Sequence, residues 1–393
     1  MPHDPRPRRP LAATSRDGDR VTVLELFFDL VFVFALHQGV GVITHGKHPL
    51  ESLGQALVLL ALVWWSWSSY AWLGNQARAD VGIVRIAMIA AMMLVFVVGL
   101  AMPEAFHDLP GGLDGPLVFV IAYLLIRMVH GVVYLTIAGS DRALRKQVAF
   151  TLSTAFVPAA VLLVIGALAG DGARLGWWAA AVAYDFLVVY VTARVGRSWR
   201  VKSASHFAER HGLIVLLALG ESVVAIGADA AEEPVGVGII AGAVLALGLA
   251  TALWWAYFVR LADLVEESVT ERPERDRYVI AVDVYTYLHP VLVAAILLVA
   301  VGVELSMPTI GEGHAIGGFA AWMLVLGLAV FLLTTVLLRA RASRSWSLPR
   351  IAATVLLLAL GPLVSGLPAL AALGLVLAIV VAALAAERLA VRG

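Results

Sequence analysis

Four ionisable side chains stand in the middle of long apolar segments: Arg127, Asp185, Glu221 and His289. Even on the lenient insertion scales, one charge at the bilayer centre costs about 2.5–3.5 kcal/mol, so such residues usually pair, face the bundle interior and mark a pathway. A rise of about 1.5 Å per residue brings all four to a similar depth near the membrane midplane. One arginine faces two carboxylates, and the excess negative charge favours a bound cation or a proton held on a carboxyl group.

A second polar layer is predicted nearer the cytoplasm, where a cytoplasmic entrance is expected. Each of its proposed members lies at or near the end of a predicted helix: Glu25, Asp29, Arg85, Glu209 and His211. Two other interpretations stay open. The arginines and carboxylates of both layers are alternatively structural clamps between helices. Glu209 and His211 alternatively cap the start of the seventh helix, where a carboxylate suits the helix dipole.

His289 precedes Pro290, which lacks a backbone N–H and clashes with the carbonyl of Thr286. The resulting kink is expected to free backbone acceptors, as in the broken helices of transporters. Asp283 lies on the same segment, and it completes a predicted substrate or ion pathway with the four midplane residues. A proline kink packed by its neighbours is the alternative.

The composition predicts an integral membrane protein that is all-α and polytopic. Of 393 residues, 61% are hydrophobic and only 14% are charged, whereas soluble domains are nearer one half and one quarter. The absence of cysteine excludes disulfides and thiolate chemistry. Zero net charge and the absence of nucleotide-binding or HExxH motifs give no reason to expect a nucleic-acid partner, a cofactor or a metal.

About twelve segments are apolar and long enough to cross a core of roughly 30 Å. They are 24–44, 53–74, 83–102, 116–137, 148–169, 176–194, 211–229, 235–258, 278–303, 315–338, 348–365 and 368–386. The last two are separated by a short turn, so that a re-entrant hairpin is an alternative for this pair.

Arginine and lysine crowd the loops on one side, and the opposite loops hold only Lys47 and Arg174. The positive-inside rule therefore predicts that both termini are cytoplasmic. The expected organisation is a disordered basic tail (1–23), a six-helix half (24–194), a cytoplasmic linker (195–210), a second six-helix half (211–386) and a C-terminal tail (387–393). Tryptophan pairs at 64–65 and 254–255 suggest a parallel six-plus-six repeat, although interfacial aromatic pairs also arise without duplication.

Two long segments carry a family resemblance: ELFFDLVFVFALHQ (25–38) and HFAERHGLIVLLALGESVVAIG (206–227). With WWSWSSYAWLGNQARAD, MPEAF, WWAYF and YTYLHP, they resemble the bacterial low-temperature-requirement protein A (LtrA) family over most of the chain. His37 and Val259 depart from the expected pattern. The resemblance implies a multi-pass protein of the bacterial cytoplasmic (inner) membrane with a link to growth at low temperature, and it carries no settled biochemical activity.

The leading hypothesis is a secondary transporter or ion pathway, coupled to a proton or cation at the midplane carboxylates. Its partners would be the lipid bilayer and a proton, small cation or small solute, and an oligomer is compatible with the sequence. The alternatives are a membrane-embedded enzyme acting on a lipid or isoprenoid carrier, with Glu221 or His289 as base, and a membrane sensor without turnover.

Overall fold

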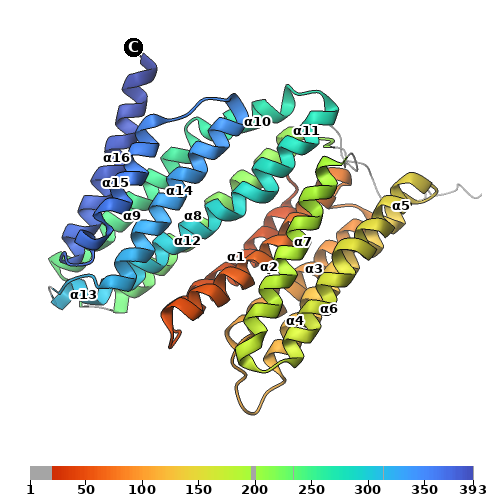
Figure 1. The fold of residues 1–393 in the computed structure, drawn as a ribbon, viewed down its shortest axis with the longest axis horizontal. Helices are drawn as coiled ribbons and strands as arrows, with labels where there is room; N and C mark the ends of the chain where they lie inside the picture. Colours follow the sequence, from red (N-terminus) through yellow and green to blue (C-terminus); the bar gives the residue numbers. More distant parts are fainter. Residues whose placement is uncertain (1–19, 196–200, 233, 313, 393) are drawn as a thin grey trace, which may run out of the picture. The chain divides into compact units, whose positions relative to one another are not determined.

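The computed structural model describes residues 20–195, 201–232, 234–312 and 314–392. The described residues form helices joined by short connections, with no β-strand among them (Figure 1). This confirms the predicted all-α architecture. Most of the predicted tail 1–23 and part of the predicted linker 195–210 lie outside the described residues.

The helices of the N-terminal part of the chain end before residue 195. They are α1 (Val23–Thr44), α2 (Pro49–Gln76), α3 (Gly82–Ala101), η1 (Met102–Glu104), α4 (Gly115–Ala138), α5 (Arg142–Thr151), η2 (Leu152–Phe156), α6 (Val157–Leu168) and α7 (Asp171–Arg194). The remaining helices are α8 (Ala204–Glu232), α9 (Val237–Phe258), α10 (Leu261–Thr270), α11 (Glu274–Ala281), η3 (Val282–Leu288), α12 (His289–Glu304), α13 (Met307–Glu312), α14 (Gly318–Ser343), α15 (Leu348–Val364) and α16 (Ala369–Arg392).

Eleven helical segments of the described chain are long and apolar enough to cross a membrane. The twelfth predicted span, 348–365, forms the shorter helix α15 of 17 residues. At about 1.5 Å per residue this helix reaches only about 26 Å, slightly less than a typical hydrocarbon core. Pro349 near its start and the turn before Pro368 limit its length.

Two boundaries differ from the expectation. The seventh long helix begins at Ala204 instead of 211, because the Ser203 hydroxyl accepts a hydrogen bond from the backbone N–H of His206 (3.2 Å) and caps the helix. The loop expected at 260–277 contains α10, which buries Leu261, Val265 and Val269. These three residues are spaced by four, so they share one face of the helix.

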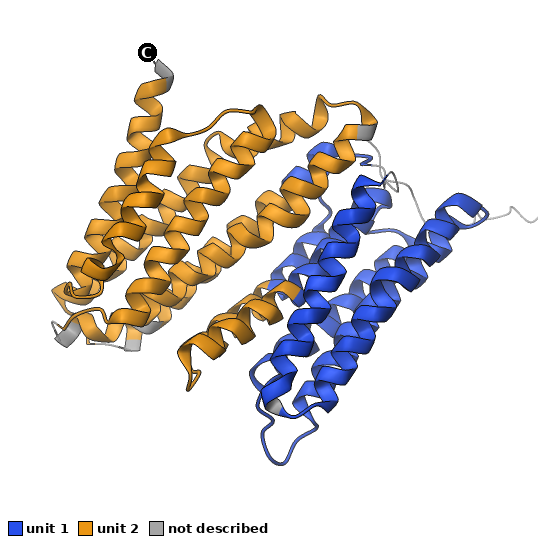
Figure 2. Cartoon of the chain, viewed as in Figure 1, with its two compact units in different colours: residues 1–32, 62–209 blue, residues 33–61, 210–393 orange. Residues whose placement is uncertain are grey.

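The chain divides into two compact units, coloured separately in Figure 2. Unit 1 comprises residues 1–32 and 62–209, and in it α3 packs against α4 and α6 against α7. Unit 2 comprises residues 33–61 and 210–393. In unit 2, α14 packs against α12 and α15, and α16 packs against α9 and α15.

Small residues allow α12 and α14 to approach closely. A Cβ atom added at Gly302 of α12 would lie 2.5 Å from the backbone nitrogen of Leu324, and one added at Gly327 of α14 would lie 2.7 Å from the backbone nitrogen of Val299. Neither position has room for a side chain. This packing through small residues is typical of helix pairs in membranes.

Helix α3 exposes large apolar side chains, as expected of a helix that faces lipid. On α3, Ile86, Met93 and Leu100 follow one another at seven-residue intervals and are between 55% and 69% exposed. The other face of the same helix buries Val84, Met88 and neighbouring apolar residues. A helix that is apolar on its exposed face as well as its buried face is suited to a bilayer.

Candidate functional site

A buried ion pair lies in unit 1, between α4 and α7. Nη1 of Arg127 donates to Oδ2 of Asp185 at 2.8 Å and to the hydroxyl of Tyr123 at 3.0 Å. The Arg127 guanidinium also lies within 6 Å of the ring centroids of Tyr123 and Phe156. Oδ1 of Asp185 is buried without a hydrogen-bond partner in the described part of the chain. Arg127 therefore compensates the charge of Asp185 directly, and one oxygen of that carboxylate accepts no hydrogen bond from the described residues.

The first turn of α1 holds a second carboxylate, Glu25. The backbone N–H of Thr22 donates to Oε2 of Glu25 (2.8 Å), and the backbone N–H of Glu25 lies 3.3 Å from the Thr22 hydroxyl oxygen. This reciprocal arrangement is a capping box, which satisfies two free N–H groups of the helix start. Glu25 is nevertheless only 1% exposed, and both of its oxygens lie 3.2 Å from Nε2 of His206.

An open cavity of about 440 Å³ adjoins this pair, all within unit 1. Glu25 and His206 line it together with Arg20, Arg78 and Asp80. Arg78 binds Asp80 with two hydrogen bonds of 3.0 and 3.1 Å, and these bonds hold the pKa of Asp80 below its usual value of 3.8. The cavity therefore adjoins a buried carboxylate–imidazole pair at the beginning of two long helices.

Asp29 lies one turn further along α1, and it is fully buried. The indole N–H of Trp67 donates to its Oδ1 at 2.7 Å. This oxygen thus accepts from a neutral donor. Asp29 adds a further carboxylate to the interior of unit 1.

Unit 2 contains a second carboxylate–imidazole pair. Nδ1 of His37 on α1 lies 2.6 Å from Oε1 of Glu221 on α8. The side chain of Glu221 is only 8% exposed, whereas that of His37 is 54% exposed. One short contact therefore joins an exposed ring to a buried carboxylate.

His289 occupies a polar cluster in unit 2 at a change of helix type. Its Nδ1 donates to the backbone carbonyl of Val284 (2.7 Å), five residues earlier, and its Nε2 lies 2.8 Å from the hydroxyl of Tyr257. Because a carbonyl only accepts, Nδ1 carries a hydrogen. The rings of His211 and Tyr285 lie 5.2 Å from the ring of His289.

The π-helix η3 ends immediately before His289 and Pro290. The wider helix and the proline together change the hydrogen-bond pattern at the position where a kink was predicted. The His289 ring takes over one backbone acceptor, the carbonyl of Val284. The same π-helix positions Asp283, whose Oδ2 accepts from Nε of Arg341 on α14 at 2.8 Å.

Of the other predicted entrance residues, two contact residues that line the cavity next to Glu25, and the third lies in unit 2. Arg85 is exposed, and its guanidinium donates to the backbone carbonyl of Asp80. Glu209, in unit 1, accepts from the backbone N–H of Val21 at 3.2 Å. His211 belongs to unit 2, where its ring lies 4.6 Å from that of Tyr285. The structure therefore brings Arg127 and Asp185 together in unit 1, and it groups His211 with His289 in unit 2.

Sequence reasoning passed over two residues that contact the predicted carboxylates, His37 and His206. Neither residue was among the predicted pathway or entrance residues. The signal that could have found them is the charge balance, since a single arginine at the midplane leaves carboxylates that need other partners. Glu221, from the predicted midplane layer, and Glu25, from the predicted cytoplasmic layer, each contact a histidine.

Comparison with known proteins agrees with this picture of a multi-pass membrane protein. A curated protein of Rhizobium meliloti (strain 1021), described as "Uncharacterized protein RA0937", is 26% identical over 310 residues, covering 76% of this chain and 72% of the relative. No solved structure matches the chain. The family described as "Bacterial low temperature requirement A protein (LtrA)" matches residues 20–385. The chain therefore belongs to the LtrA family of bacterial membrane proteins.

Proposed function

We propose that this protein is a secondary transporter or ion pathway of the bacterial inner membrane, which moves a proton or small cation by way of Glu221. The observation that carries the proposal is the repeated pairing of a buried carboxylate with a histidine. Glu25 pairs with His206, Glu221 pairs with His37, and each pair joins α1 to α8. Both members of such a pair bind and release protons, whereas an arginine stays charged.

The charges support different roles for the two midplane carboxylates. Asp185 is fixed by Arg127, so that its charge is balanced and we assign it a structural part in the pathway. Glu221 faces a histidine instead, and its charge depends on where the proton resides. Glu221 is therefore the better candidate for the group that couples ion movement to a change of state.

The cavity next to Glu25 supports an entrance on the side predicted to be cytoplasmic. Glu25 and His206 line this cavity, and Asp29 is buried one turn further along α1. Carboxylates that follow one another along a helix are the usual elements of proton and cation relays. In this proposal Glu25 and His206 exchange protons with water in the cavity.

The test is ion flux in proteoliposomes that contain a pH-sensitive dye, under imposed proton, sodium or potassium gradients. Wild type should exceed empty liposomes, and Glu221→Gln should reduce flux to the empty level because the amide cannot ionise. His37→Gln should lower flux without abolishing it. Glu51→Gln, at an exposed carboxylate in the first turn of α2, is the matched control and should behave as wild type.

Glu25→Gln separates transport from stability. Glutamine also serves in a capping box, so the helix start should remain intact while the titratable group is lost. We expect an unchanged melting temperature together with reduced flux. Wild-type flux that persists in Glu221→Gln would contradict the proposal.

One observation also supports a second function, that of a membrane-embedded enzyme acting on a lipid or isoprenoid carrier. Glu25 and His206 line an open cavity, where such a pair could act as general base and acid. Wild type that shows no flux under any gradient, but converts added lipid or isoprenoid substrates in a Glu25-dependent way, would support this second function and contradict the first.

A further inference from the structure

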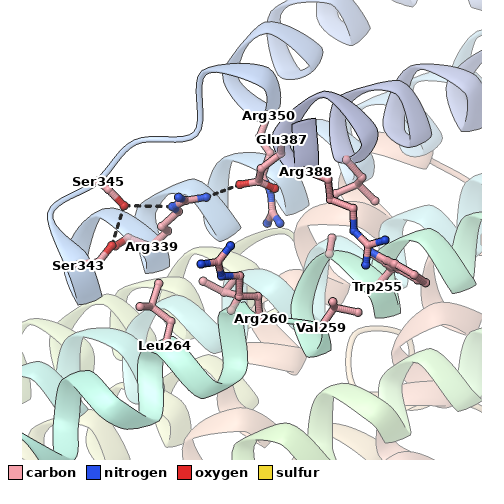
Figure 3. A pocket seen from close by; sticks show the side chains of 13 residues that line it. Trp255, Val259, Arg260, Leu264, Arg339, Ser343, Ser345, Arg350, Glu387 and Arg388 are labelled. Atoms are coloured by element: carbon pink, nitrogen blue, oxygen red, sulfur yellow. Dashed lines mark hydrogen bonds and ion pairs between the residues drawn. The ribbon is translucent and has the colours of Figure 1, made fainter. Parts of the chain in front are cut away.

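A second open cavity, of about 470 Å³, lies within unit 2 and shares no residue with the pathway described above. It is formed where α9, α14 and α16 end and where α10 and α15 begin (Figure 3). Its volume is within the usual range of small-ligand sites, about 300–1,000 Å³. The cavity is therefore large enough for a lipid headgroup.

Arginine dominates the charge of this cavity. The lining contains four arginines, Arg260, Arg339, Arg350 and Arg388, and one carboxylate, Glu387, so that its net charge is 4 − 1 = +3. Glu387 binds two of the arginines, Arg339 through Oε1 and Arg350 through Oε2 (2.8 Å). Arg350 is only 8% exposed, so this part of the cavity is a built, buried arrangement.

The other two arginines are exposed and carry two of the three excess positive charges. Neither Arg260 nor Arg388 has a carboxylate partner among the residues that the structure describes. The guanidinium of Arg388 lies 4.1 Å from the ring centroid of Trp255, which holds it beside the cavity (Figure 3). Arginine binds phosphate oxygens with paired N–H groups, so a phosphate suits these two side chains.

The rest of the lining is apolar and favours a lipid over a free ion. Trp255, Leu261, Leu264 and Leu384 form this part of the wall. Trp346, in the connection that leads to α15, is 60% exposed, and the following Leu348 is 73% exposed. Exposed tryptophan next to basic residues is typical of the headgroup level of a membrane, where acyl chains and phosphates meet.

We propose that this cavity binds the phosphate headgroup of an anionic membrane phospholipid, with Arg260 and Arg388 as its principal ligands. Arg339 and Arg350, held by Glu387, keep the cavity positive. Trp255 and the leucines receive the beginning of the acyl chains. The proposal is independent of ion transport, because no residue of the cavity belongs to the pathway.

Native mass spectrometry of the full chain in detergent tests this proposal, with phosphatidylglycerol and cardiolipin as probes and phosphatidylcholine as the zwitterionic comparison. The double variant Arg260→Gln/Arg388→Gln should bind the anionic lipids about 25-fold more weakly, since each arginine near an anionic lipid contributes about fivefold. Either single substitution should show about fivefold weaker binding. If the double variant is unstable, the lipid affinities of the two single variants provide the test.

The matched control is Arg142→Gln/Arg145→Gln, which removes the same charge from exposed positions of α5 in unit 1. It should bind anionic lipid as wild type does. Equal losses in both double variants, or equal binding of phosphatidylcholine by wild type, would overturn the proposal. Inorganic phosphate that binds at these arginines while phosphatidylglycerol does not would identify a free anion as the ligand and would also overturn it.

Discussion

At the scale of single residues, the chain uses two different partners for its buried carboxylates. Arg127 pairs with Asp185, and an arginine stays charged, whereas His206 and His37 contact Glu25 and Glu221. Histidine is the side-chain type suited to exchanging protons near neutral pH. This difference between the two kinds of partner is the basis of the proposed pathway.

Removing one partner of the Arg127–Asp185 pair should strongly destabilise the protein. Asp185→Asn leaves a buried guanidinium without its counter-ion, and we expect the free energy of unfolding in detergent to fall by about 3–5 kcal/mol. Replacing both partners, Arg127→Leu with Asp185→Leu, should recover most of this loss, because no uncompensated charge remains.

The control for this prediction is Asp80→Asn. Asp80 pairs with Arg78 at the surface, where such pairs contribute only about 0–1 kcal/mol. A double-mutant cycle on Arg127 and Asp185 measures the coupling directly. If Asp185→Asn and Asp80→Asn lower the free energy of unfolding equally, the buried pair contributes no more to stability than the surface pair.

At the scale of elements, helix boundaries and contacts depend on short local features. The capping box of Thr22 and Glu25 begins α1, and Ser203 begins α8. The π-helix η3 precedes Pro290 at the predicted kink. Close approach of α12 and α14 depends on Gly302 and Gly327, where no side chain fits.

Gly302 provides a test of that close approach. Gly302→Ala would place a methyl group 2.5 Å from a backbone nitrogen of α14, so that the two helices must separate. We expect a loss of about 1–3 kcal/mol in the free energy of unfolding, as for other overpacked positions. Gly374→Ala on α16 is the matched control, since a Cβ there meets nothing within 4 Å.

The control substitution should be neutral or stabilising by up to about 1 kcal/mol, because alanine favours a helix over glycine. Thermal unfolding of both variants in the same detergent gives the comparison. If Gly302→Ala is as stable as Gly374→Ala, the α12–α14 packing does not depend on glycine.

At the scale of the whole molecule, the asymmetry of basic residues predicts cytoplasmic termini. The chain has no cysteine, so single cysteines can be introduced without background. Lys47→Cys, in a connection predicted to face outward, should react with a membrane-impermeant maleimide in intact cells. Ser140→Cys, in the basic connection between α4 and α5, should react only after permeabilisation.

The reverse labelling pattern would contradict the predicted topology and would place the Glu25 cavity on the outer side. The two positions serve as controls for each other, because both lie in short connections between long helices. Their accessibility therefore reports the side of the membrane and not the depth of burial.

Features that depend on near neighbours in the chain could be predicted from the sequence. Hydropathy over about 20 residues located the long helices, loop charges predicted their orientation, and two long motifs indicated the LtrA family. The proline at position 290 also marked the place where the helix changes type. These features are local because a helix satisfies its own backbone and needs only its own apolar residues to enter a membrane.

The contacts between charged residues could be seen only in the folded chain. His37 and Glu221 are 184 residues apart in the chain, and Arg341 and Asp283 are 58 apart. No local pattern predicts such contacts, because they depend on the rotation and packing of separate helices. The basic cavity around Arg260 and Arg388 depends in the same way on five helix ends that meet in space. In the sequence, each of its arginines is indistinguishable from any other basic residue of a loop.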